Sequence, residues 1–201
     1  MSTEQELVER ARQGDCRAFA SLVRRHEGRL YRLALGILHH AEDAEDAVQV
    51  TLVSSLEHVA DFRGDWVAFG GWLNRIAANT ALQMLARRRD LSLEGLGGSV
   101  DESFAQRRRP QIPRTLDPHE IAERRELQRL LDEAVADLPD DLRLVFVLRE
   151  LAGLSTRETA ERLGAPEGTV KVRLLRARLA LRDRLGPVFR QFETCVRESS
   201  S

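Results

Sequence analysis

Hydrophobic positions recur at the spacing of an α-helix in two long stretches of the chain, which are separated by a segment without a period. The first stretch, residues 4–89, repeats apolar residues at intervals of three and four, so each repeat marks one face of a helix. The first apolar stripe consists of Ala18, Leu22, Val23, Leu30, Leu33, Ala34, Ile37 and Leu38. The second consists of Ala44, Ala47, Val48, Leu52, Val53 and Leu56. A break follows with Gly64 as its turn residue, and a third stripe begins at Trp72.

The second periodic stretch covers residues 119–192 and is also helical by its pattern. Between the two stretches, residues 90–118 contain glycines, serines and three prolines, a composition that predicts a flexible linker. Residues 193–201 are expected to form a frayed tail. We therefore predict an all-α fold, with one small helical domain over residues 1–89 and a second over 119–192.

Composition excludes several classes of protein. The chain has 201 residues, of which 42% are hydrophobic, 31% charged and 5% aromatic. No apolar run reaches the roughly 18 residues needed to span a bilayer, and the N-terminus lacks a signal-peptide pattern, so we expect a cytoplasmic protein without membrane insertion. Cys16 and Cys195 are far apart and lack the spacing of a disulfide framework or zinc site, so no metal or cofactor is expected.

Charge is distributed unevenly along the chain, although the formal net charge is only −1. Residues 120–143 contain eight acidic and four basic side chains, whereas residues 167–184 contain six basic and two acidic side chains. The local balances are therefore −4 and +4, which indicates two different kinds of binding partner.

The segment from residue 154 to 178 has the pattern of a helix-turn-helix. Ser155 and Glu158 form a capping box at a helix start, and Gly164 can adopt the left-handed conformation that ends that helix. Pro166 suits the turn before the next helix. The two helices are expected to pack together through Ala160, Leu163, Val170 and Leu174.

The second helix of this motif has the chemistry of a DNA-reading helix. Lys171, Arg173 and Arg176 lie on or beside its outward face, and Arg178 follows. Lysine chiefly binds phosphates, whereas arginine can bind phosphates or pair with guanine edges. The helix N-terminus near Thr169 can receive a phosphate. An ordinary helical hairpin with a solvated basic face is the alternative interpretation.

These residues resemble a known family. The run Gly-Ala-Pro-Glu-Gly-Thr-Val-Lys at 164–171 is similar to region 4 of the extracytoplasmic-function sigma factors. Segments 14–19, 43–49, 62–65 and 72–79 are similar to their region 2 in order and spacing. The resemblance implies a non-enzymatic initiation factor that binds core RNA polymerase, recognises the −35 and −10 promoter elements and helps to open the −10 DNA.

The resemblance also implies the partners and their contact residues. It assigns binding of the polymerase clamp to an acidic helix carrying Asp43, Glu45, Asp46 and Gln49. A carboxylate cluster of this kind attracts a basic protein surface. Val50 stands where the family usually has Glu, so one polar contact is expected to be lost. The polymerase flap and an anti-sigma factor are the further protein partners implied.

For the −10 element, the resemblance implies contacts by Phe62, Arg63, Trp66, Asn79, Arg87 and Arg88. A loop with two aromatic rings and a charge can hold an unpaired base. The chain departs from the family at Asn74 and at Gly70 and Gly71. Each glycine is expected to weaken the helix start by roughly 1 kcal/mol.

For the −35 element, the resemblance implies contacts by Thr169, Lys171, Val172, Arg173 and Arg176. The family commonly has Ser where this chain has Val172. Valine cannot donate a hydrogen bond to a base edge but can contact a thymine methyl, so an altered −35 preference is expected.

Two other classes of function remain as alternatives. A stand-alone regulator would use the helix-turn-helix on an operator, but it leaves the acidic helix and the loop at 62–65 without a role. An enzyme would need a nucleotide-binding loop, a catalytic set or a metal spacing, and none rises above chance. His39 and His40 precede Glu42 and Asp43, yet adjacent helical positions point apart, so solvated or capping histidines are the preferred interpretation.

Overall fold

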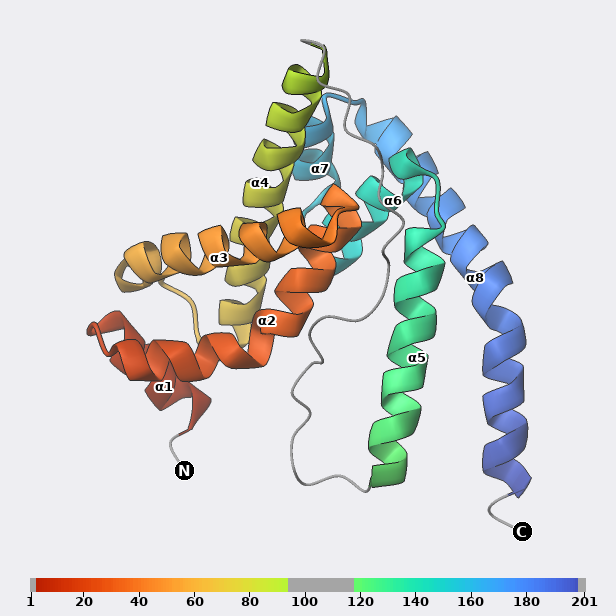
Figure 1. The fold of residues 1–201 in the computed structure, drawn as a ribbon, viewed down its shortest axis with the longest axis horizontal. Helices are drawn as coiled ribbons and strands as arrows, with labels where there is room; N and C mark the ends of the chain where they lie inside the picture. The colour runs from red at the N-terminus through yellow and green to blue at the C-terminus, as the bar shows by residue number, and fades with distance from the viewer. Residues whose placement is uncertain (1–2, 94–117, 199–201) are drawn as a thin grey trace. The chain divides into compact units, whose positions relative to one another are not determined.

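The computed structural model describes the backbone of residues 3–93 and 118–198 and the side chains of residues 3–88 and 125–187. Over these residues the secondary structure is helical and contains no strand, which confirms the all-α prediction (Figure 1). The helices form two compact units, the first built from α1–α4 and the second from α5–α8. Most of the predicted linker lies outside the described residues, as do the last residues of the predicted tail.

The first unit consists of α1 (Glu4–Arg12), α2 (Cys16–Leu38), α3 (Ala41–His58), a short 3₁₀ helix η1 (Val59–Asp61) and α4 (Trp66–Leu93). Helix α2 packs against α1, α3 and α4, and α3 packs against α4. All eight apolar residues of the first predicted stripe are buried on α2, so this helix is the centre of the core. Helix α4 extends into the segment predicted as linker.

Local side-chain caps fix where these helices begin. Asp15 Oδ1 accepts hydrogen bonds from the backbone N–H groups of Arg17 and Ala18, at 2.9 and 3.1 Å, and so starts α2. His39 ends α2 with a left-handed φ of 55°. His40 then starts α3, because its Nδ1 accepts the backbone N–H of Asp43 at 3.4 Å. This histidine is a helix cap, as the sequence indicated.

The buried face of α3 differs from the predicted one. Val53 and Leu56, which were expected in its apolar stripe, are 60% and 43% exposed. The buried face of α3 is instead completed by Thr51 and Ser55, which are fully buried. The Thr51 hydroxyl donates to the Ala47 carbonyl oxygen at 2.7 Å, so its polar group is satisfied inside the helix and can be buried at small cost.

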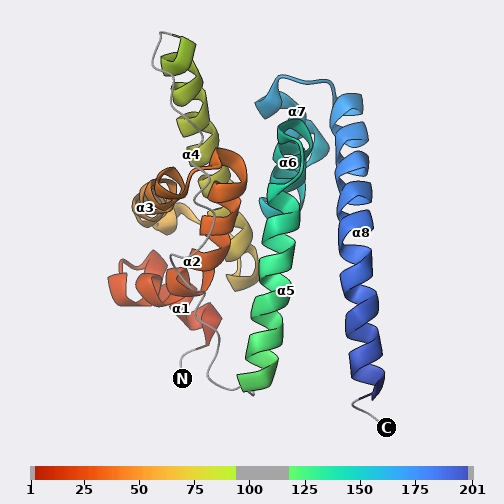
Figure 2. The same cartoon turned by 45° about the vertical axis from the view of Figure 1, so that its right-hand side comes forward.

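The second unit contains α5 (Pro118–Ala136), α6 (Asp140–Phe146), most of a π-helical segment η2 (Val147–Leu151), α7 (Thr156–Leu163) and α8 (Glu167–Glu198). Helix α8 contacts α5, α6 and α7, and Figure 2 shows α5 running alongside it. Their shared core consists of Ala134, Leu138, Ala177, Leu181 and Leu185. Helix α8 extends into the segment predicted as a frayed tail.

A buried arginine joins α5 to α6. The side chain of Arg143 is only 6% exposed. Its Nη1 donates to the carbonyl oxygens of Leu138 and Ala136, at 2.9 and 3.3 Å, and its Nη2 donates to Asp140 Oδ1 at 2.6 Å. It thereby satisfies the carbonyl groups of the last residue of α5 and of a residue two positions beyond the helix.

Candidate nucleic-acid and protein interfaces

The helix-turn-helix predicted from the sequence is formed by α7 and α8. Ser155 Oγ accepts the Glu158 N–H at 3.1 Å, and Glu158 Oε2 accepts the Ser155 N–H at 2.7 Å, which completes the capping box. Gly164 ends α7 with a left-handed φ of 59°. The helices pack through a core of Val145, Ala160, Val170 and Leu174, with Phe146 and Leu163 against it.

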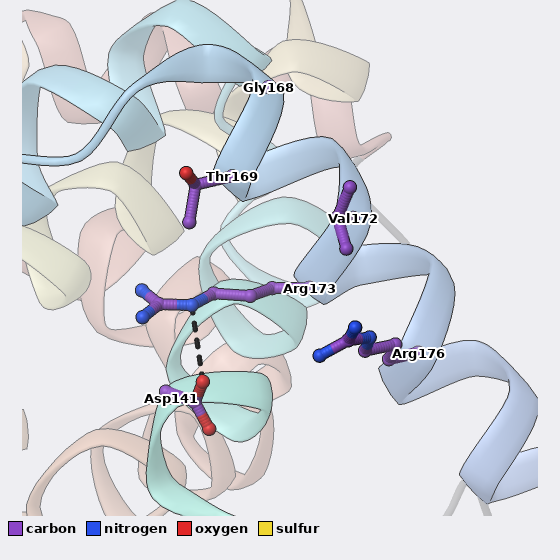
Figure 3. Close-up of a pocket in the computed structure, with 6 residues that line it drawn as sticks. All are labelled: Asp141, Gly168, Thr169, Val172, Arg173 and Arg176. Carbon is purple, nitrogen blue, oxygen red and sulfur yellow. Dashed lines mark ion pairs between the residues drawn. The ribbon is translucent and has the colours of Figure 1, made fainter.

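The outward face of α8 gathers most of the residues predicted for the −35 element. Thr169, Val172, Arg173 and Arg176 line one open hollow, and Figure 3 shows their side chains projecting from two successive turns of α8. Val172 is 49% exposed within this basic face. Lys171 is exposed as well, but it does not line the hollow.

Two residues that the sequence analysis missed also line this hollow: Gly168 on α8 and Asp141 on α6. Asp141 Oδ2 lies 3.1 Å from Arg173 Nε and forms an ion pair with it. Arg176 has no ion-pair partner among the residues whose side chains are described. No sequence signal links positions 141 and 173, because the pair depends on how α6 packs against α8.

Phe62, which was predicted to contact the −10 element, lies in the core of the first unit. Its side chain is buried, with 7% exposure, and its ring packs against Phe69 and Trp72 at centroid distances of 5.6 and 5.0 Å. The guanidinium of Arg12 covers the ring, with its central carbon 5.3 Å from the ring centroid. Phe62 therefore supports the loop from below and offers no open face on which a base could stack.

Arg63 and Trp66, the other loop residues predicted for the −10 element, are both exposed. Trp66 is 46% exposed at the first position of α4. Asp65 fixes the helix start beside it, because its Oδ1 accepts the Ala68 N–H at 2.9 Å. Gly64 has no room for a side chain, since a Cβ there would lie 2.5 Å from the Phe62 ring. The loop therefore holds the Trp66 ring at the surface, above the buried ring of Phe62 and next to the capped start of α4.

Further along α4, a row of exposed polar side chains follows the i, i+4 spacing of a helix face. Asn79 and Arg87 were predicted from the sequence, and both are exposed. Arg75 and Gln83 lie on the same face and are also exposed. The spacing alone could have found them, since all four positions differ by multiples of four.

Helix α3 presents a surface with two parts. Asp46 and Gln49 are exposed in its first half, while Asp43 and Glu45 are partly covered. The second half exposes an apolar stripe formed by Val50, Val53 and Leu56, which are 52%, 60% and 43% exposed. We call these three residues the α3 apolar stripe; only Val50 had been singled out from the sequence as a surface residue.

The predicted polymerase and −10 surfaces share an ion pair. Arg88 Nη1 donates to Asp43 Oδ2 at 3.1 Å, and both side chains are about one-third exposed, at 37% and 33%. Because this bond partly occupies Arg88 at the end of the α4 row, Arg87 is the more accessible arginine there.

Within the part of the chain whose side chains are described, no group of three or more His, Cys, Asp or Glu residues is placed to hold a metal ion. The described helices also include none with the length and hydropathy of a membrane span.

Comparison with known proteins assigns both units. The family description "Sigma-70 region 2" matches residues 22–90, and "Sigma-70, region 4" matches residues 128–181. The chain is 34% identical over 188 residues to the RNA polymerase sigma-H factor of Pseudomonas aeruginosa, and this alignment covers 94% of this chain and 96% of that protein. It is also 34% identical over 190 residues to the ECF RNA polymerase sigma-E factor of Escherichia coli K12, spanning 94% and 97%.

A solved structure shares the fold. The sigma factor RpoE of Bartonella quintana, determined in complex with the anti-sigma factor NepR, is similar with a TM-score of 0.50 and 24% sequence identity. The match covers 80% of this chain and 92% of that one. At this identity the likeness concerns the fold alone.

Proposed function

Since the chain belongs to the extracytoplasmic-function sigma factors of the sigma-70 family and is thus a promoter-specificity initiation factor for RNA polymerase, we propose which of its surfaces makes each contact. The observation that carries the assignment is that the hollow on α8 gathers four of the five residues expected at the −35 element. Members of this family act by binding and DNA opening rather than by catalysis.

The −35 element is read by the outward face of α8. Arg173 and Arg176 provide the guanidinium groups that can pair with guanine edges or phosphates, and Lys171 provides a phosphate contact beside them. Val172 offers an apolar contact to a thymine methyl. Because the chain as a whole carries a net charge of −1, counterion release alone gives little affinity, and correct base contacts matter more.

Run-off transcription with core polymerase tests this surface. Arg176→Ala is expected to lower promoter use about tenfold, the loss typical of one good base contact. Arg184→Ala is the matched control, because Arg184 lies on the same helix, is 54% exposed and does not line the hollow. Val172→Ser should change the preferred base at one −35 position. An unchanged sequence preference would count against the role of Val172.

The −10 element contacts the loop at 63–66 and the exposed row of α4. Trp66 supplies the ring on which an unpaired base stacks, and Arg63 supplies a nearby positive charge. Asn79 and Arg87 then follow the strand along α4. Phe62 holds the loop in place through its buried ring rather than by touching the base.

Permanganate reactivity of −10 thymines in the holoenzyme complex tests this assignment. Trp66→Ala removes a stack worth roughly 1–3 kcal/mol and should reduce opening strongly. Trp66→Phe keeps a ring and should retain most of it. Equal opening by the alanine variant and the natural protein would reject Trp66 as the stacking residue.

The clamp of the polymerase contacts the exposed face of α3. Asp46 and Gln49 provide polar and charged contacts, and the α3 apolar stripe supplies area that a partner can remove from water. An exposed apolar row that continues from an acidic cluster fits a protein partner better than DNA, because carboxylates repel phosphates.

Co-elution with core polymerase distinguishes this surface from others. Val53→Asp places a charge in the α3 apolar stripe and should weaken co-elution at least tenfold, while leaving the fold intact because Val53 is 60% exposed. Val67→Asp is the matched control on α4, where Val67 is 66% exposed. Equal co-elution of both variants would remove α3 from the clamp interface.

Two further protein contacts belong to the proposal. The hollow in the second unit that suits the flap region of the polymerase is mostly apolar and is lined by Phe146, Arg178, Leu181, Arg182, Leu185 and Gly186. An anti-sigma factor is the expected regulator, as the resemblance to the family implies. Its binding should compete with core polymerase for the α3 surface.

A further inference from the structure

The hollow on α8 contains a carboxylate at a place where a DNA-binding face is expected to be purely basic. Asp141 lines it together with Arg173 and Arg176 and is 51% exposed at its side chain. An acidic group beside a DNA backbone lowers non-specific affinity through repulsion of phosphates. The presence of a carboxylate here, despite its cost in affinity, is explained if the carboxylate improves recognition of particular bases.

The geometry of the ion pair shows what the carboxylate does. Asp141 Oδ2 lies 3.1 Å from the Nε of Arg173, on the side of the guanidinium nearest to α8 (Figure 3). The two terminal nitrogens extend further from α8, beyond the contact with Asp141. Two parallel N–H groups at the end of a guanidinium match the O6 and N7 acceptors of guanine. The pair therefore leaves the base-reading end of Arg173 available.

Fixing an arginine before binding has an energetic advantage. A free arginine side chain loses much conformational freedom when it is held against a base, which offsets part of the gain from its hydrogen bonds. Arg173 is 34% exposed and already held, whereas Arg176 is exposed and has no ion-pair partner among the described side chains. An exposed ion pair adds little to folding stability, so its effect should appear in recognition.

We propose that Asp141 is a positioning residue, which holds the Nε of Arg173 so that the terminal nitrogens read a guanine edge in the −35 element. The inference rests on the proposed role of the α8 face. Asp141 itself touches no base. Its negative charge lowers the non-specific affinity for DNA, while its contact with Arg173 increases discrimination at the base pair that Arg173 contacts.

The experiment measures base preference at every −35 position, using full-length protein in holoenzyme with core polymerase and a promoter library randomised over that element. Arg173→Ala first identifies the base pair that Arg173 reads, as the position where preference is lost. Asp141→Asn should then reduce preference at that same position by roughly three- to tenfold. Asp141→Glu, which keeps the carboxylate, should retain part of it.

Asp137→Asn is the matched control. Asp137 lies on the polypeptide just before α6 and forms an ion pair with Arg184, also on α8, and each side chain of that pair is 54% exposed. Asp137→Asn removes the same charge as Asp141→Asn and also breaks an ion pair to α8, but Asp137 does not line the hollow. We expect it to leave the preference unchanged at every position.

The outcomes separate the inference from the function on which it rests. If Arg173→Ala changes no base preference, the proposed role of Arg173 fails. If Arg173→Ala removes a preference that Asp141→Asn leaves intact, the positioning role of Asp141 is wrong. Stronger binding of Asp141→Asn to all sequences alike, with an unchanged profile, would also overturn it, because charge alone explains that result. In the Arg173→Ala background, Asp141→Asn should have no further effect on base preference.

Discussion

Replacing Gly70 with alanine should destabilise the first unit, whereas the same replacement at its neighbour Gly71 should stabilise it. Both residues lie inside α4. Alanine favours a helix over glycine by about 1 kcal/mol, so helix propensity predicts the same gain at both positions. The difference between the two variants must therefore come from their surroundings.

The surroundings differ in one contact. A Cβ on Gly71 meets no atom within 4 Å, but a Cβ on Gly70 would lie 2.8 Å from Cε1 and 3.2 Å from Nδ1 of His26. His26 cannot move freely, because its ring lies against Phe69 with a centroid distance of 6.0 Å. Overpacking of this kind costs roughly 1–3 kcal/mol. We therefore expect Gly71→Ala to gain about 1 kcal/mol and Gly70→Ala to lose up to about 2 kcal/mol.

Urea unfolding followed by tryptophan fluorescence measures this difference selectively. The two tryptophans of the chain, Trp66 and Trp72, both belong to α4, so the signal reports the first unit. The variants should differ in midpoint by roughly 0.5–2 M urea. Equal upward shifts in both would refute the packing argument, since helix propensity alone would then explain the data.

Three other predictions concern stability. Burial, together with the charge of Arg29, lowers the pKa of His26 below its ordinary value. As the pH falls from about 7.5 to 5.5 the unfolded chain therefore binds a proton before the folded chain does, so the first unit should lose stability, and urea midpoints that do not change with pH would contradict this. Arg143→Ala should lower the free energy of unfolding by about 2–4 kcal/mol, because alanine cannot donate hydrogen bonds to the carbonyl groups after α5. Unfolding followed by circular dichroism should show no such loss for Arg157→Ala, a control at an exposed arginine. Phe62→Ala should cost about 3–5 kcal/mol in the first unit, and a loss below 1 kcal/mol by differential scanning calorimetry would show that its ring is not part of the core.

Features encoded by neighbouring residues could be predicted from the sequence. The capping box at Ser155 and Glu158 and the left-handed Gly164 are local, because each depends on residues a few positions apart. The helix-turn-helix could therefore be located, and the apolar residues that join its helices were identified correctly. The helical class followed from the 3.6-residue period for the same reason.

Features that depend on packing could not be predicted. Hydrophobicity placed Val53 and Leu56 in the core, but small hydroxyl residues fill that side of α3, since Thr51 can satisfy its own hydroxyl within the helix. Phe62 has the chemistry of a base-stacking residue, and only the positions of its aromatic neighbours show that the ring is covered. The contact between Asp141 and Arg173 joins residues on different helices, so no spacing rule reveals it.

The most direct test of the central claim is run-off transcription from a fully randomised promoter library, by core polymerase to which the purified chain has been added. The account predicts that the chain co-elutes with core polymerase and that the transcribed promoters contain two enriched sequence blocks at a fixed spacing. Arg176→Ala should weaken the upstream block and Trp66→Ala the downstream one. Failure to bind core polymerase, together with tight binding of the chain alone to duplex DNA, would contradict the account and indicate a stand-alone regulator.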